Sequence, residues 1–155
     1  MNGLRWVIAV ATVAFITPAQ AATTDPEVIL YRVSGVSDSG GNANTGVATS
    51  FHCTNFSGVT ETVRIVLRAK TATLLTNVAF TVQHLETHTT STKATNLFSD
   101  DTVLNSGLVF QGTAAIAATS TNIICTSMIV DAAATAPAGI SLRMLRFNPI
   151  PGTQE

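Results

Sequence analysis

Charged residues are scarce in this sequence, and acidic and basic residues are interspersed along it. Asp, Glu, Lys and Arg make up 11% of the 155 residues, with eight basic and nine acidic side chains and a formal net charge of −1 at pH 7. Nucleic acids and anionic membranes attract proteins through clusters of Lys and Arg. Because the sequence shows no such cluster, we expect neither a nucleic acid nor an anionic membrane as partner.

Several motifs that mark enzymes are also missing. No Gly-x-Ser-x-Gly sequence is present, so a Ser–His–Asp site would have to be assembled from scattered residues. No glycine-rich phosphate loop stands between a strand and a helix pattern, which leaves nucleotide binding without support. A glycosidase needs two carboxylates that flank a sugar, whereas we expect the adjacent Asp100 and Asp101 on a solvated turn. We therefore expect a non-catalytic protein.

A helical period is a further absence. After residue 21, no segment repeats its apolar residues every 3.6 positions over the roughly ten residues that a helix requires. Short alternating segments occur instead, and the clearest is 59–68, where Val63, Ile65 and Leu67 alternate with mostly polar residues. Residues 122–130 are apolar at both parities and predict a central strand, while 140–147 predict the last strand. About seven to nine such segments, separated by turn signals, predict an all-β antiparallel sandwich.

The first 21 residues predict a secretory signal peptide. Arg5 precedes an uncharged apolar run from Trp6 to Ile16, and small residues follow up to Ala21. A bilayer span needs about 20 apolar residues, so the alternative of an uncleaved membrane anchor is disfavoured. We expect residues 22–155 to form a single β-sandwich domain with a short polar N-terminal lead-in, a proline-rich C-terminal tail and no membrane span. Such a protein is exported to the periplasm or the extracellular space.

The sequence holds only two cysteines, Cys53 and Cys125. Exported proteins keep disulfides, and two cysteines allow one intramolecular pairing, so we expect a Cys53–Cys125 disulfide and no free thiol. Alternation along residues 46–54 places Cys53 on the core face with Phe51 and leaves His52 on the opposite, outward face.

The positions of the two cysteines resemble those of immunoglobulin-like domains. Cys53 and Cys125 fall on the second and the next-to-last expected strands, and in that family a disulfide between such strands joins the two sheets. The resemblance implies an inter-sheet disulfide. The chain departs from the family because no tryptophan remains after residue 21, and because Ile123 stands where a tyrosine is usual, two residues before the second cysteine. We expect a generic immunoglobulin-like β-sandwich and not an antibody-type domain.

His84, Glu86 and His88 form the best candidate site in the sequence. On a strand these three side chains share one face, and two imidazoles with a carboxylate are ligands that zinc and copper accept. His52 is a candidate for a further nitrogen ligand. Neighbours at this spacing lie about 7 Å apart on a regular strand, so a metal site requires the strand to bend. The alternative is that these residues lie on the surface near a strand end and that no cofactor is bound.

Binding and assembly are the roles that the composition leaves open. Phe56, in the turn 55–58, is the aromatic residue that we expect to be exposed, and it is a candidate contact for a glycan or a protein partner. Few charges are present to protect sheet edges, which makes a self-assembling surface or fibre subunit, or another homo-oligomer, an alternative. We expect a non-catalytic binding or structural module of an exported bacterial protein, with a secreted zinc- or copper-binding protein as the other alternative.

Overall fold

The computed structural model describes residues 27–136 and 138–146, and these residues form ten strands and no helix. The all-β prediction is therefore confirmed for this part of the chain. The predicted signal peptide and the predicted proline-rich tail lie outside the described residues. The strands are β1 (Val28–Asp38), β2 (Val47–Asn55), β3 (Glu61–Arg68), β4 (Leu74–Val82), β5 (Thr87–Ser91), β6 (Thr102–Val103), β7 (Val109–Ala118), β8 (Ile123–Asp131), β9 (Gly139–Leu142) and β10 (Met144–Arg146).

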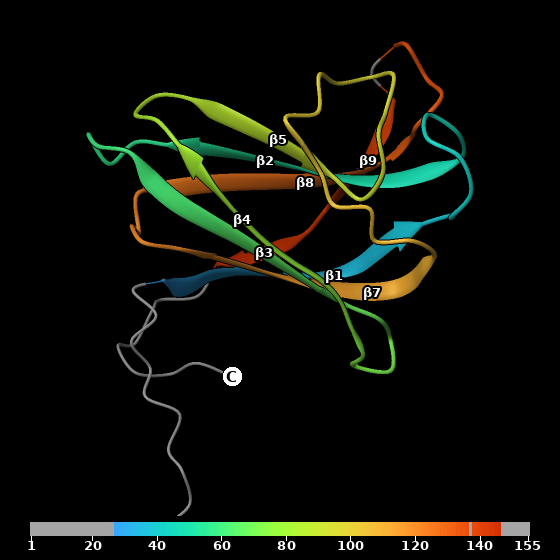
Figure 1. Ribbon diagram of the computed structural model, residues 1–155, viewed down its shortest axis with the longest axis horizontal. Coiled ribbons are helices and arrows are strands. Elements are labelled where there is room, and N and C mark those ends of the chain that lie inside the picture. The colour runs from blue at the N-terminus through green and yellow to red at the C-terminus, as the bar shows by residue number, and fades with distance from the viewer. Residues whose placement is uncertain (1–26, 137, 147–155) are drawn as a thin grey trace, which may run out of the picture.

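The strands form two five-stranded sheets that lie one above the other (Figure 1). Sheet A has the order β10-β1-β7-β3-β4, and sheet B has the order β6-β5-β2-β8-β9. Neighbouring strands pair antiparallel, except that the short β6 pairs parallel with β5. The predicted central strand at residues 122–130 is confirmed as β8, because β2 pairs with one side of it and β9 with the other.

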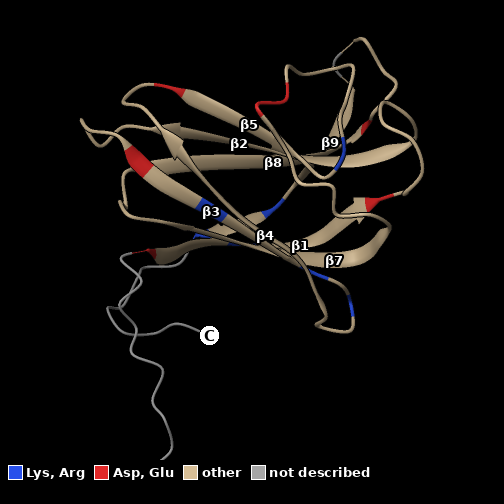
Figure 2. Ribbon diagram, viewed as in Figure 1, with Lys and Arg blue, Asp and Glu red and all other residues tan. Residues whose placement is uncertain are grey.

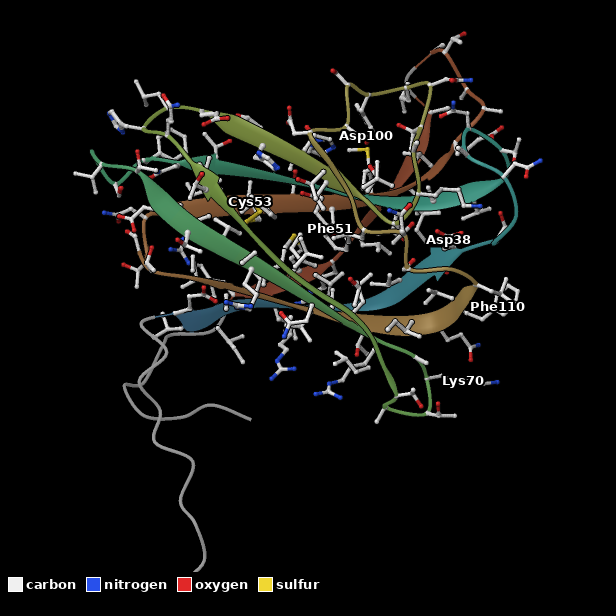
Figure 3. The ribbon with its side chains drawn as sticks, viewed as in Figure 1. Asp38, Phe51, Cys53, Lys70, Asp100 and Phe110 are labelled. Atoms are coloured by element: carbon white, nitrogen blue, oxygen red, sulfur yellow. A yellow bond between two sulfur atoms is a disulfide. The ribbon has the colours of Figure 1, made fainter. Side chains whose placement is uncertain are left out.

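The core lies between the two sheets. In β3, the alternating Val63, Ile65 and Leu67 are fully buried, as predicted. Phe51 is the largest fully buried side chain, and it points from sheet B into the space between the layers (Figure 3). Hydrogen bonds also join the two sheets: the Tyr31 hydroxyl of β1 donates to the Ile123 carbonyl of β8 at 3.1 Å, and the Asn55 side chain of β2 donates to the Val82 carbonyl of β4 at 2.8 Å. Apolar burial between the sheets is the main force that holds them together.

The predicted disulfide is present, but the prediction that it joins the two sheets is wrong. Cys53 on β2 and Cys125 on β8 lie directly opposite each other within sheet B, with their Cα atoms 4.1 Å apart. Both side chains are buried against the core, so the predicted core-facing position of Cys53 is right. A core-facing cysteine can reach across the core or to the neighbouring strand, and alternation along one strand does not distinguish the two. The inter-sheet disulfide that the resemblance to immunoglobulin-like domains implied is therefore not formed by these two cysteines.

Two expected segments are divided differently in the structure. The predicted last strand is two strands: β9 pairs with β8 in sheet B, and β10 pairs with β1 in sheet A, so the chain changes sheet at Arg143. Two glycines within residues 103–118 predict a hairpin or a broken strand, because glycine inside a strand usually marks a bulge or a corner. The structure instead has the end of β6 and the ten-residue strand β7 in this segment. Gly112 lies inside β7, where a Cβ atom would come within 2.9 Å of the Arg68 carbonyl oxygen. Glycine at this position therefore permits the close approach of β7 and β3.

Candidate functional site

The residues of the predicted metal site do not share one strand face. His84 and Glu86 lie in the connection before β5, which begins at Thr87. The Nδ1 atom of His84 accepts a hydrogen bond from the backbone N–H of Gly58 at 3.1 Å. The Glu86 carboxylate accepts one from the backbone N–H of Gln83 at 2.6 Å, which stabilises the turn.

His88, the third residue of that set, lies on β5 with partners of its own. Its Nε2 atom is 2.9 Å from the Thr102 hydroxyl, and its ring stacks on Phe80 with the ring centroids 4.1 Å apart. In the part of the chain that the structure describes, no group of three or more His, Cys, Asp or Glu side chains is placed to hold a metal ion. The three residues therefore stabilise local contacts in this structure.

Phe56 directly follows β2 and has 49% of its surface exposed. Its backbone N–H donates to the Asn122 carbonyl at 3.0 Å, which ties this turn to the connection before β8. Two other apolar side chains near strand ends, Val59 and Leu85, are also exposed. The exposure of Phe56 agrees with the prediction, and its role in binding a partner stays a prediction.

The outer side of sheet B carries a buried cluster of polar side chains that the sequence did not suggest. The hydroxyl groups of Ser50 on β2 and Ser91 on β5 are 2.8 Å apart, and Ser91 donates to the Asp100 carboxylate at 2.5 Å. Asp100 also accepts hydrogen bonds from the backbone N–H and the hydroxyl of Thr95. It lies on the loop that passes over sheet B (Figure 3). The expectation that Asp100 belongs to a solvated turn is thus wrong, because its carboxylate holds this loop on the sheet.

His52 lies beside this cluster, partly covered by the same loop and not simply facing outward as predicted. Its Nδ1 atom is 3.1 Å from the Thr89 hydroxyl, and its ring contacts the edge of Phe98 with the ring centroids 4.6 Å apart. Burial lowers the pKa of His52 below its usual value of 6.5, and the negative charge of Asp100 partly opposes this shift.

The cluster brings serine, histidine and aspartate together, but not in the order that nucleophilic catalysis requires. A catalytic histidine hydrogen-bonds to the nucleophile and is oriented by the carboxylate. Here the serine hydroxyl donates directly to Asp100, and the histidine contacts a threonine. Ser50 is also fully buried, so no substrate can reach it. We interpret these side chains as a clamp between sheet B and the loop above it.

A buried ion pair forms a second clamp. The Nζ atom of Lys93 is 2.9 Å from Oδ1 of Asp38, and the two side chains are only 8% and 1% exposed. The ammonium group also contacts the Ser39 hydroxyl and the carbonyls of Gly40 and Thr45. Its donors are therefore committed to the loop between β1 and β2, although Lys93 lines a small hollow of about 240 Å³.

The outer face of sheet A contains the arrangement that we identify as the candidate binding site. A hollow of about 460 Å³ opens on this face, with three arginines and one glutamate around an apolar floor. It is lined by Glu27, Ile29, Arg32, Arg64, Val66, Arg68, Ala72, Leu74, Asn77, Ala115 and Ala117. We call it the first hollow.

Strand pairing explains why these arginines surround a shallow depression. Arg32 on β1 is opposite Ala115 on β7, and Ala115 is in turn opposite Val66 on β3. The same central strand places Ala117 between Ile29 and Arg64. Because alanine side chains are short and successive side chains alternate between the faces of a strand, β7 forms the low centre of this outer face. The longer arginines of β1 and β3 rise on either side of it.

The arginines of the first hollow have different partners. Arg64 makes a two-point ion pair with Glu27, in which the Nε–Oε2 distance is 2.5 Å and the Nη2–Oε1 distance is 3.1 Å. Arg64 also donates a hydrogen bond to the Asn77 side chain at 3.0 Å. Glu27 is only 5% exposed, so this pair is a fixed part of the wall. Arg68 is exposed and donates one N–H to the Ala72 carbonyl at 3.0 Å.

A second hollow of about 470 Å³ adjoins the first. It is lined by Arg32, Val33, Ser34, Thr113, Ala114, Arg143 and Leu145. Arg32 lines both hollows, and Arg143, at the crossing from β9 to β10, adds a fourth guanidinium to the same face. The two hollows together contain four arginines and a single acidic residue, Glu27.

The charge of the described residues is therefore segregated, although the sequence is nearly neutral. In Figure 2, basic residues lie mainly along the layer formed by sheet A, and acidic residues lie at strand ends and in the loops. This face is not visible in the sequence, because Arg32 is far from Arg64 in the chain. The two residues reach the same face only because their strands, β1 and β3, pair with opposite sides of β7. One signal was present, since Arg64 and Arg68 share the polar face of a well-defined strand.

Such a face can bind anions. The planar guanidinium group offers a fork of N–H donors that matches carboxylate, sulfate and phosphate oxygens, and it keeps its charge at all physiological pH values.

Across the described ranges, the chain forms no helix that is long and apolar enough to cross a membrane. Comparisons of the chain with protein-family models, with curated proteins and with solved structures gave no match.

Proposed function

We propose that this chain is an exported, non-catalytic binding module, and that its ligand is an anion held on the outer face of sheet A. The observation that carries the proposal is the first hollow, where Arg32, Arg64 and Arg68 surround an apolar floor. The single carboxylate there, that of Glu27, is already paired with Arg64. Among the described lining residues, three guanidinium groups thus accompany one carboxylate, and this balance favours a negatively charged ligand.

The size and lining of the first hollow support this role. Ligand sites are commonly about 300–1,000 Å³, are mostly apolar, and contain a few convergent polar groups. The first hollow, at about 460 Å³, has an alanine floor and guanidinium groups at its wall. Among the described residues that line it, none is aromatic, so these residues offer no stacking surface to a neutral sugar ring. An anion with a modest apolar part fits these features best.

Export is supported by two features of different kinds. Residues 1–21 have the pattern of a secretory signal peptide. The buried Cys53–Cys125 disulfide is of a type that persists in oxidising compartments. We therefore place the binding activity in the periplasm or outside the cell.

Isothermal titration of the purified protein with small anions tests the binding proposal. We expect galacturonate, benzoate and inorganic sulfate to bind measurably at low salt. The Arg68→Gln variant should weaken binding about five-fold, which corresponds to roughly 1 kcal/mol for an exposed charged contact. Lys70→Gln is the matched control, because Lys70 is an exposed cation on the adjacent β3–β4 turn that lines neither hollow (Figure 3). Absence of binding by every anion, or equal losses in the two variants, would contradict the proposal.

Self-assembly is a second candidate function, and the edge of sheet A favours it. The edge strand β4 is nine residues long and contains neither a charged residue nor a proline. Such an edge leaves backbone N–H and C=O groups for pairing with another chain. Size-exclusion chromatography over a wide concentration range tests this idea, with Thr81→Lys, which puts a charge on β4, as the comparison. Association that Thr81→Lys abolishes would support it, whereas a monomer at every concentration would exclude it.

A further inference from the structure

The two hollows on sheet A are neighbours, because Arg32 is part of the lining of both. Building on the proposed function, we infer that the natural ligand is a linear polysaccharide that carries carboxylate groups. It lies across strands β3, β7, β1 and β10 and fills both hollows. The inference specifies the ligand class of the proposed site and depends on that site being an anion site.

The register of sheet A aligns the groups that would contact such a chain. Arg68 is opposite Thr113, and Thr113 is opposite Ser34. Arg143 immediately precedes Met144, which is opposite Val33, so Arg143 continues the same row beside Ser34. The row Arg68–Thr113–Ser34–Arg143 therefore crosses four strands, with a guanidinium at each end and two hydroxyl groups between them.

The dimensions of this row exceed those of a small anion. Neighbouring strands lie about 4.8 Å apart, so the Cα atoms of Arg68 and Arg143, three strands apart, are separated by about 14 Å. Arg32 lies one row away, between the two ends, opposite Ala115. A chain that carries a carboxylate on successive units can pair with both ends of the row at the same time.

The groups between the arginines favour sugar units over other charged polymers. Ser34 and Thr113 are exposed and can exchange hydrogen bonds with sugar hydroxyls. Single-stranded nucleic acid binds to surfaces that stack its bases on aromatic side chains, and none of the described residues that line the two hollows is aromatic. An acidic peptide can also pair its carboxylates with arginines, but it lacks the hydroxyl groups on each unit that Ser34 and Thr113 can contact, so poly-L-glutamate is the comparison that separates the two ligands.

A length series of oligogalacturonates tests the inference on the purified protein. We expect the affinity to rise from the monomer to the dimer and tetramer, and to level off once the chain reaches both Arg68 and Arg143. Methyl-esterified oligogalacturonate, which has the same backbone without the charge, should not bind. The longest member of the series is the galacturonate hexamer. It is compared, at matched charge concentration, with poly-L-glutamate, oligothymidylate and vesicles of anionic phospholipid, and each of these should bind more weakly than the hexamer.

Two variants separate the contributions of the two hollows. Arg143→Gln removes a cation that lines only the second hollow, so it should weaken hexamer binding roughly five-fold and leave monomer binding unchanged. Arg68→Gln should weaken both, and Lys70→Gln should weaken neither. If the monomer binds and the hexamer binds no more tightly, the inference is wrong while the proposed anion site stands. If neither binds, both are wrong. If poly-L-glutamate, oligothymidylate or vesicles bind as tightly as the hexamer, the polysaccharide assignment is overturned.

Discussion

Removal of the Lys93 ammonium group should destabilise the protein strongly. Lys93→Met leaves the carboxylate of Asp38, which is 1% exposed, without its cation at 2.9 Å. The remaining contacts of Asp38 are the Gly40 N–H at 2.7 Å and a weak one from Ser106 at 3.5 Å. Breaking a buried ion pair on one side typically costs about 3–5 kcal/mol. Since small domains are stable by roughly 5–15 kcal/mol, we expect Lys93→Met to lose a large part of its stability.

The double variant Asp38→Asn/Lys93→Met separates the unpaired charge from the other losses. It leaves no buried charge, and the carbonyls of Gly40 and Thr45 lie in a loop where water can replace the ammonium. We expect the double variant to lose only about 1–2 kcal/mol and thus to be more stable than Lys93→Met, because a removed pair costs less than a broken one. Lys70→Met, at an exposed position, should change stability by less than about 0.5 kcal/mol.

Urea unfolding, followed by far-UV circular dichroism, measures the free energy of unfolding for the four members of this cycle. A coupling energy of at least about 2 kcal/mol is expected between positions 38 and 93. If the losses in the free energy of unfolding of Asp38→Asn and Lys93→Met sum to the loss of the double variant within about 0.5 kcal/mol, the pair does not act as a clamp and the reasoning is refuted.

Two further predictions concern sheet B. Replacing both Cys53 and Cys125 by alanine should lower the free energy of unfolding by up to ~4 kcal/mol, given their separation of 72 residues. An unchanged urea midpoint in this variant would refute the prediction. The native wild-type protein should show no titratable thiol. Burial lowers the pKa of His52 below 6.5, so the unfolded chain binds more protons than the folded one between the folded-state pKa and 6.5. The contribution of neutral His52 to the free energy of unfolding should therefore be fully present above about pH 6.5 and should decrease as the pH falls through that window. His52→Gln should reduce this decrease when urea midpoints at pH 7.5 and pH 5.5 are compared, and an identical pH dependence in the variant would show that His52 does not cause it.

The features that were predicted correctly are those that depend on local alternation. Val63, Ile65 and Leu67 face the core because a strand exposes its side chains to opposite faces in turn, and this pattern is visible in the sequence. The apolar run around Cys125 likewise predicted a central strand. Pairing of the two cysteines followed from their number together with the predicted export of the chain.

The errors concern which strands are neighbours. Local alternation places Cys53 on the core side, but it does not show that β8 lies beside β2 in the same sheet. The basic face was missed for the same reason, since Arg32 and Arg68 come together only because β7 pairs with both of their strands. The shared strand face expected for His84, Glu86 and His88 is not formed, because β5 begins only at Thr87.

Mapping of bound galacturonate by amide chemical shifts tests the central claim most directly, because it locates the ligand without any substitution. Two-dimensional ¹H–¹⁵N spectra of the protein are recorded as sodium galacturonate is added, with sodium chloride at equal ionic strength as the control. We predict that the largest shifts specific to galacturonate occur at Arg32, Arg68 and Ala115, which line the first hollow on the outer face of sheet A. Shifts centred on Phe56 or on the loop around Asp100, or no specific shifts at all, would contradict the account.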